Sequence, residues 1–186
     1  MAKLNDDVVY GRTALRNGEP WIVPSSLDHL KTIIQPEWKV FEWGAGGSTI
    51  FFAKHCRFVV SIEHNIEWID RVYKMINRLN APRHKIVLQW WPGAEDAFDS
   101  YAKAIMPYHD LDLIYIDGEA SSRGHCLNLA LSRVRPGGYL LLDNSDWLKR
   151  DLGDEWERTD YVAKDLTWVG QSGTFNWWTS IVRRKE

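Results

Sequence analysis

The sequence predicts an α/β fold, in which a doubly wound, mostly parallel sheet ends in an antiparallel pair of strands. Short runs of β-branched or aromatic residues alternate with segments of helical periodicity, which is the pattern of parallel β-α-β units. A glycine-rich turn, Gly44–Ala45–Gly46–Gly47, follows the first of these runs, where a helix should begin. Near the end of the chain, only a turn region containing Gly170 and Gly173 separates two strand-like runs, which favours antiparallel pairing.

Hydrophobic periodicity places the individual elements. The predicted strands are Val40–Trp43, Phe58–Glu63, Ile86–Trp90, Leu111–Asp117, Gly138–Asp143, Tyr161–Val169 and Asn176–Val182. One helix is expected ahead of the first strand, over residues 24–34, and another directly after the glycine turn. The remaining helices are predicted at Ile66–Asn80, at Ala94–Ile105 and from about Ser122 to the residues before Pro136.

Length and composition predict one domain and limit its partners. The chain has 186 residues, of which 45 % are hydrophobic, enough to bury a core of its own. Its 23 basic and 25 acidic residues leave no cationic excess, so we expect no nucleic-acid partner. The N-terminus lacks the pattern of a signal peptide and no apolar run reaches membrane-spanning length, which predicts a cytoplasmic protein without membrane contact. Cys56 and Cys126 fit neither a disulfide framework nor a metal-ligand spacing.

Tryptophan is unusually abundant, with 11 residues against 7 tyrosines and 6 phenylalanines. Two pairs of neighbours, Trp90–Trp91 and Trp177–Trp178, lie in predicted strands or at their ends, where successive side chains face opposite sides of a sheet. These rings either pack against helices on both faces or line a pocket for a planar or sugar-like acceptor.

The turn after the first strand carries the strongest functional signal. Glycines there let a ligand approach the backbone, and the following helix offers free N–H groups. A dinucleotide motif would need a third glycine where Thr49 stands, and it has no use for Glu42 two residues before Gly44. Glu42 can pair with a cationic amino-acid portion of a ligand. Glu63 ends the second strand, where its carboxylate can accept hydrogen bonds from both hydroxyls of a ribose.

These residues resemble a known family. Glu42-x-Gly44-x-Gly46-Gly47 is similar to motif I of the class I S-adenosylmethionine-dependent methyltransferases, and the segments 112–118 and 135–144 resemble their fourth strand and the Pro-Gly-Gly hairpin into their fifth. The resemblance implies a Rossmann-like, three-layer α/β/α fold whose seven-stranded sheet has an antiparallel last strand. In this fold, residues 36–182 would form the catalytic core and residues 1–35 a helical cap on the acceptor side. The positions that it assigns to S-adenosylmethionine are Glu42, Gly44, Ala45, Gly46, Ser48, Glu63, His64, Ala94, Glu95 and Asp117.

The motifs that are missing narrow the acceptor. The chain has no Asn/Asp-Pro-Pro-aromatic motif of amino-directed DNA enzymes, no Pro-Cys nucleophile of cytosine C5 enzymes and no double-Glu hairpin of protein-arginine enzymes. O-methylation of a small molecule or a sugar hydroxyl is therefore expected. The alternatives are an N-methyltransferase, a metal-independent enzyme acting on polysaccharide precursors, and a non-catalytic nucleotide-binding module; a NAD-dependent oxidoreductase is disfavoured by Glu42 and the broken glycine motif.

A second group of polar residues suggests a metal. Asp117 ends the fourth predicted strand, and Asp143 and Asn144 end the fifth, so two acids and an amide should meet at neighbouring strand ends in a set that suits Mg²⁺. The set resembles the metal site of catechol- and caffeoyl-type O-methyltransferases, which implies a cation that lowers the pKa of the acceptor hydroxyl. That family usually has a lysine where Ala120 stands, which leaves Glu119 or His125 as the candidate base. We therefore predict Asp117 and His125 as the catalytic residues.

Overall fold

The computed structural model describes residues 13–91, 97–165 and 175–186 of the chain. Seven strands form one sheet in the order β3-β2-β1-β4-β5-β7-β6. The strands are β1 (Lys39–Trp43), β2 (Phe58–Glu63), β3 (Ile86–Trp90), β4 (Leu111–Ile116), β5 (Val134–Asp143), β6 (Trp156–Asp165) and β7 (Phe175–Arg184). The first five are parallel, whereas β7 lies antiparallel between β5 and β6. The predicted mostly parallel, seven-stranded sheet with an antiparallel last strand is confirmed.

The two strands that differ most from their predicted limits are β5 and β6. β5 begins at Val134, four residues before the predicted start, and its pairing with β4 shifts register between Leu111 and Leu113. β6 begins at Trp156, and its first five residues carry mostly charged or polar side chains that no apolar alternation marks as a strand. Backbone pairing with β7 holds this edge strand in place, so tertiary context outweighs local propensity there. The predicted turn at residues 170–173 lies outside the described residues.

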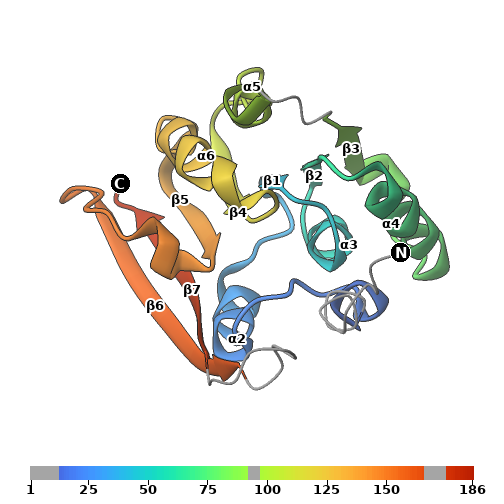
Figure 1. Cartoon of the computed structure of the whole chain (residues 1–186), viewed down its shortest axis with the longest axis horizontal. Helices are drawn as coiled ribbons and strands as arrows, with labels where there is room; N and C mark the ends of the chain where they lie inside the picture. Colours follow the sequence, from blue (N-terminus) through green and yellow to red (C-terminus); the bar gives the residue numbers. More distant parts are fainter. Residues whose placement is uncertain (1–12, 92–96, 166–174) are drawn as a thin grey trace.

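Helices cover both faces of the sheet, and Figure 1 shows α5 and α6 on one side with α2 and α3 on the other. The helices are α2 (Pro24–Ile33), α3 (Gly47–His55), α4 (Ile66–Arg78), α5 (Ala97–Lys103) and α6 (Arg123–Ala130), with 3₁₀ turns η1 (Arg83–Lys85), η2 (Ala120–Ser122) and η3 (Ser145–Leu148). The first part of the helix predicted at Ala94–Ile105 falls on residues that are not described. Among the described helices, none has the length and apolar character needed to cross a bilayer.

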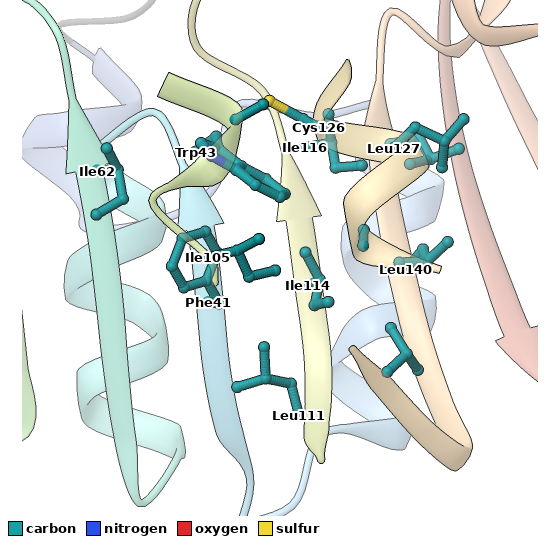
Figure 2. Close-up of a cluster of buried hydrophobic side chains, with 14 of the residues drawn as sticks. Phe41, Trp43, Ile62, Ile105, Leu111, Ile114, Ile116, Cys126, Leu127 and Leu140 are labelled. Atoms are coloured by element: carbon teal, nitrogen blue, oxygen red, sulfur yellow. The ribbon is translucent and has the colours of Figure 1, made fainter. Parts of the chain in front are cut away.

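The core follows from the alternation of side chains along the central strands. Phe41 and Trp43 of β1 point to the face covered by α5 and α6, where they pack with Ile105 and Leu127 (Figure 2). Val40, which precedes Phe41, belongs to the cluster on the opposite face. Because both faces of the parallel strands are covered, β4 is buried along its whole length.

The N-terminal helix packs onto the sheet. Leu30 of α2 is fully buried in the same cluster as Phe52 of α3 and Ile181 of β7. The backbone N–H of Val23, which precedes α2, donates to Thr179 Oγ1 of β7 at 3.0 Å. The division of the chain into a cap at residues 1–35 and a core at 36–182 stays a prediction.

The candidate site lies at the carboxyl edge of the parallel strands. β1 leads into the glycine turn, β2 ends at Glu63, β4 leads into Asp117 and β5 ends at Asp143. The strand order reverses between β1 and β4, and in open α/β sheets ligands bind in the crevice outside such a reversal. Topology thus gathers residues that are distant in the sequence at one edge.

Candidate functional site

Glu42 is a fully buried carboxylic acid at the end of β1, beside the glycine turn. Its Oε1 accepts hydrogen bonds from the hydroxyls of Thr49 and Ser61, both at 2.5 Å. Its Oε2 is also buried and has no hydrogen-bond partner within the described parts of the chain. Burial raises the pKa of Glu42 to about 7, and the nearby hydroxyls of Ser48, Ser61 and Thr49 act in the opposite direction. Such an oxygen suits a cationic donor supplied by a ligand.

The glycines of the turn have different physical roles. Gly44 has φ +92°, and a Cβ there would lie 2.6 Å from the backbone nitrogen of Gly118, so this glycine lets the loops after β1 and β4 touch. A Cβ on Gly47 would lie 2.1 Å from the carbonyl oxygen of Glu19. Gly46 has an extended backbone with φ 174°, and among the described residues no heavy atom from a more distant part of the chain lies within 4 Å of the position of its Cβ. Gly46 is therefore the glycine that borders open space, and its backbone is free of positive-φ strain.

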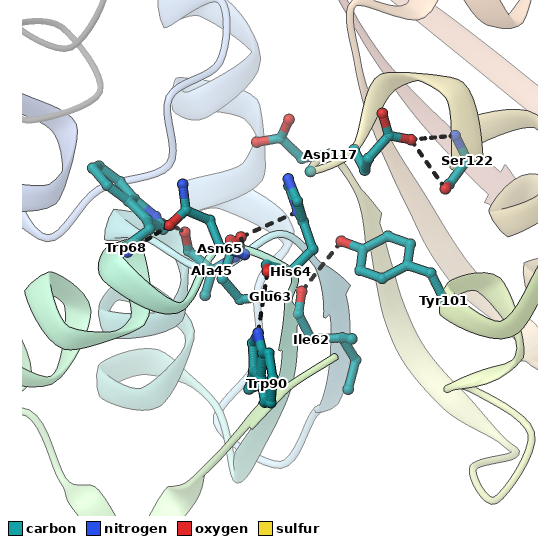
Figure 3. Close-up of polar contacts among 12 residues, drawn as sticks. Ala45, Ile62, Glu63, His64, Asn65, Trp68, Trp90, Tyr101, Asp117 and Ser122 are labelled. Atoms are coloured by element: carbon teal, nitrogen blue, oxygen red, sulfur yellow. Dashed lines mark hydrogen bonds and ion pairs between the residues drawn. The ribbon is translucent and has the colours of Figure 1, made fainter. Parts of the chain in front are cut away.

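Glu63 joins the end of β2 to the glycine turn. Its Oε2 accepts from the backbone N–H of Ala45 at 3.1 Å, and its Oε1 accepts from that of Asn65 at 2.8 Å (Figure 3). Burial raises the pKa of Glu63, and the two backbone hydrogen bonds act in the opposite direction. Trp68 supports the turn from α4, since its Nε1 donates to the carbonyl of Ala45 at 2.6 Å. Glu63 is thereby held in place with lone pairs left for further donors.

Aromatic side chains surround the residue that follows Glu63. The ring of His64 meets that of Tyr101 edge-on, with centroids 6.0 Å apart, and its Nδ1 lies 3.2 Å from Glu63 Oε1. The exposed Trp90 donates from Nε1 to the carbonyl of His64 at 3.2 Å. Sequence reasoning did not find Tyr101, which reaches the site from α5 without a local motif. Ala94 and Glu95, the other predicted cofactor contacts, lie outside the described residues.

Asp117, Asp143 and Asn144 do meet at neighbouring strand ends, as predicted, but a fourth side chain lies among them. The Nη2 of Arg123 is 2.7 Å from Asp117 Oδ1. Its Nη1 donates to Asn144 Oδ1 at 2.8 Å and to the backbone carbonyl of Asp143 at 2.9 Å. Sequence reasoning missed Arg123, and its only signal is a cationic residue shortly after Asp117, in the first turn of the next helix.

The carboxylate of Asp143 has partners of its own. Its Oδ1 accepts from Trp177 Nε1 at 2.9 Å and from Thr179 Oγ1 at 3.2 Å, both in β7. Burial, together with the charge of Asp117, raises the pKa of Asp143 to about 8. Within the described part of the chain, no group of three or more His, Cys, Asp or Glu side chains is arranged to hold a metal ion. The predicted Mg²⁺ site is not supported, because the donor set already surrounds a guanidinium and one of its acids is engaged elsewhere.

The two candidate bases, Glu119 and His125, lie outside the group of side chains around Arg123. Glu119 caps η2, where its Oε2 accepts from the backbone N–H of Ser122 at 2.8 Å. Burial raises the pKa of Glu119, but hydrogen bonds from Ser121 and Ser122 outweigh that effect and lower it. His125 is exposed on α6 and lines a hollow of about 390 Å³ with Trp147, and Asp117 is not among the lining residues. The pairing of Asp117 and His125 as catalytic residues stays a prediction.

Comparisons with known proteins bear on the fold. No protein-family profile matches the sequence. No curated protein matches it either. Among solved structures, an O-methyltransferase from Bacillus cereus in complex with S-adenosylhomocysteine superposes with a TM-score of 0.66, at 20 % identity over 99 % of this chain and 94 % of its own.

Two further structures show the range of these neighbours. The O-methyltransferase TomG from Streptomyces achromogenes, in complex with S-adenosylmethionine, gives a TM-score of 0.63 at 16 % identity over 99 % of this chain and 92 % of its own. An rRNA methylase from Streptococcus thermophilus gives a TM-score of 0.63 at 13 % identity, over 87 % of this chain and 95 % of its own. Likeness at such low identity establishes architecture, and the chain has the fold of the class I S-adenosylmethionine-dependent methyltransferases.

Proposed function

We propose that the chain is an S-adenosylmethionine-dependent methyltransferase that transfers a methyl group to a hydroxyl of a small molecule or a sugar. The observation that carries this proposal is a glycine turn with two buried carboxylates beside it. Among the described residues, the space over Gly46 is open, one oxygen of Glu42 has no partner, and Glu63 is hydrogen-bonded to the turn. S-adenosylmethionine is a cation, which suits the acid at Glu42. The diphosphate of a dinucleotide would instead bring negative charge toward that acid.

Seven of the ten predicted cofactor residues have a role in binding the cofactor in this proposal. The backbone of Gly44, Ala45 and Gly46, together with Glu42 and Ser48, would hold the methionine portion. Glu63 would accept hydrogen bonds from the ribose hydroxyls, and His64 would border the adenine. When bound, the cofactor supplies an electrophilic sulfonium methyl group, so the protein's contribution is to position the acceptor oxygen and to exclude water.

Asp117 is the residue best placed to orient an acceptor. Its side chain is one-third exposed, and both of its oxygens accept hydrogen bonds, from Arg123 at 2.7 Å and from Tyr115 Oη at 3.2 Å. A carboxylate held in this way can accept a hydrogen bond from an acceptor hydroxyl and direct its lone pair toward the methyl group.

Exposed indoles near the same edge support a planar or sugar-like acceptor. Trp90 is 51 % exposed beside His64, and Trp147 is 59 % exposed after β5. Trp21 is 41 % exposed and packs edge-on against Trp177, which itself donates to Asp143.

The net charge of −2 argues against an rRNA acceptor, since phosphate contacts require a cationic excess. We place the activity in the cytoplasm, because two buried free cysteines suit a reducing compartment.

Calorimetry with S-adenosylhomocysteine and with NAD tests the proposal. The wild-type chain should bind the former in preference to the latter, and Glu63→Ala should weaken binding by about 30- to 150-fold, as the loss of charge-assisted hydrogen bonds worth about 2–3 kcal/mol requires. Glu67→Ala removes an equal charge from the exposed surface of α4 and should bind as wild type does. Tight NAD binding, or equal affinities of Glu63→Ala and Glu67→Ala, would contradict the proposal.

A further inference from the structure

The guanidinium of Arg123 is buried and surrounded by oxygen atoms. Its side chain is only 7 % exposed. Four oxygens accept hydrogen bonds from its two Nη atoms: Asp117 Oδ1 at 2.7 Å, Asn144 Oδ1 at 2.8 Å, the carbonyl of Asp143 at 2.9 Å and the carbonyl of Gly118 at 3.3 Å. Carboxylate, amide and carbonyl oxygens are the donor types that hard divalent cations bind. We call these four atoms the oxygen cage.

The backbone is shaped to present these oxygens. Asn144 adopts a left-handed conformation with φ 45° and ψ 47°, which asparagine tolerates better than most residues. Gly118, with φ +68°, lies against Gly44, so its carbonyl is positioned by the contact between two loops. The cage thus combines the ends of β4 and β5, and it depends on the tertiary arrangement of both.

The location of Arg123 is unfavourable for the helix that carries it. Arg123 is the first residue of α6, and a cation at a helix N-terminus opposes the helix dipole. Burial of a guanidinium is also costly unless its donors are satisfied. The indole of Trp147 covers the group, with its ring centroid 5.2 Å from the guanidinium carbon. The oxygen cage satisfies both Nη atoms and the indole covers the group, whereas Nε is buried without a hydrogen-bond partner among the described residues. The position of Arg123 is therefore explained by this cage and not by the helix.

We infer that the oxygen cage of Asp117, Gly118, Asp143 and Asn144 is a cation site whose cation is the guanidinium of Arg123, and that the site takes no divalent metal ion. A metal ion at these oxygens would stand in contact with a buried guanidinium, where charge repulsion is weakly screened. The carboxylate of Asp143 is held toward β7 by the hydrogen bonds that its Oδ1 accepts from Trp177 and Thr179. The corollary that methyl transfer proceeds without a divalent cation rests on the function proposed above, whereas the metal-binding inference does not.

In this arrangement Arg123 acts as a positioning residue. It fixes Asp117 by an ion pair at 2.7 Å and, through Asn144, joins that residue to the end of β5. A guanidinium does so permanently, because it keeps its charge at every physiological pH and needs no ion from solution. The orientation of Asp117 is therefore independent of metal supply.

Metal binding measured by thermal melting and by the electron paramagnetic resonance of Mn²⁺ tests the inference. Millimolar Mn²⁺ or Mg²⁺ should leave the melting temperature of the wild-type chain unchanged. In Arg123→Ala the cage loses its cation, and Mn²⁺ should bind and raise the melting temperature by about 3 °C or more through ligand linkage. This gain should disappear in Arg123→Ala combined with Asp117→Asn. Arg150→Ala, which removes an exposed arginine outside the cage, should behave as wild type does.

Two results would overturn the inference. One is Mn²⁺ or Mg²⁺ binding by the wild-type chain that Asp117→Asn abolishes, because the cage would then hold a metal in the presence of Arg123. The other is a folded Arg123→Ala variant that binds no Mn²⁺, because the oxygens would then not form a cation site. Should Arg123→Ala fail to fold, the wild-type measurement remains decisive. None of these measurements uses S-adenosylhomocysteine, so failure of the proposed function would be seen separately.

Discussion

Substitution of Glu42 by Gln tests whether the glycine turn contains a buried acid that is half-protonated near neutral pH. The change keeps the shape of the side chain and an oxygen for Thr49 and Ser61, and it removes only the ionisable group. In the folded chain the pKa of Glu42 is raised from its usual 4.5 to about 7 by burial. The folded state therefore retains a proton between pH 4.5 and 7 that the unfolded state has released.

The sign and size of the effect follow by linkage. Because the pKa of Glu42 is higher in the folded state, the contribution of its protonated form to the free energy of unfolding is complete below about pH 4.5. This contribution is lost as the pH rises through about 7. Each pKa unit corresponds to about 1.4 kcal/mol, so ionised Glu42 costs the wild-type chain about 3 kcal/mol above pH 8. Glu42→Gln does not carry this cost. Between pH 5 and 8 the stability of the variant relative to wild type should rise by about 2–3 kcal/mol, which corresponds to about 5–10 °C in melting temperature.

Urea or thermal unfolding of both proteins at a series of pH values from 5 to 8.5 measures the difference. The titration of Asp143 is common to both proteins and cancels in the comparison. Glu37→Gln is the matched control, since Glu37 is exposed in the turn before β1, and the profile of this variant should run parallel to that of wild type. If the profile of Glu42→Gln also runs parallel, Glu42 is not a strained buried acid and its orphaned oxygen is no argument for a cationic ligand.

Two further predictions concern the same chain. Gly46→Val should melt as wild type does yet lose S-adenosylhomocysteine binding, because its Cβ enters space that the described residues leave open. Gly44→Val should lower the melting temperature, because it forces a positive φ and a 2.6 Å contact with Gly118. Normal binding by Gly46→Val would show that the ligand lies elsewhere. Cys56 and Cys126 are buried, and burial raises the pKa of both thiols, that of Cys56 to about 12. A thiol reagent should therefore react with them only as fast as the protein unfolds. Rapid labelling of the native protein would refute this prediction.

Most of the fold could be predicted from local patterns. Strand and helix alternation is a periodic signal, and it identified the five parallel strands because each is flanked by helices or turns that end it. The same is true of the glycine turn and of Glu63, whose positions after the first and second strands follow from chain order alone. The start of β6 at Trp156 could not be predicted in this way, since backbone pairing with β7 stabilises it and its side chains carry no alternation.

The composition of the site beyond those residues was decided by tertiary structure. Gly118 after β4 meets Gly44 of the turn only because the strand order places β4 beside β1. Tyr101 of α5 meets His64 after β2, although the two residues are far apart in the sequence. Asp117 and Asp143 illustrate this difference. The order of the strands correctly predicted that the two acids lie close together, but the cation among their oxygens is Arg123, whose side chain extends from α6. Sequence periodicity determines which residues end neighbouring strands, because it is a property of consecutive residues. The direction and partners of each side chain there depend on contacts between distant segments, and only the folded chain brings those contacts about.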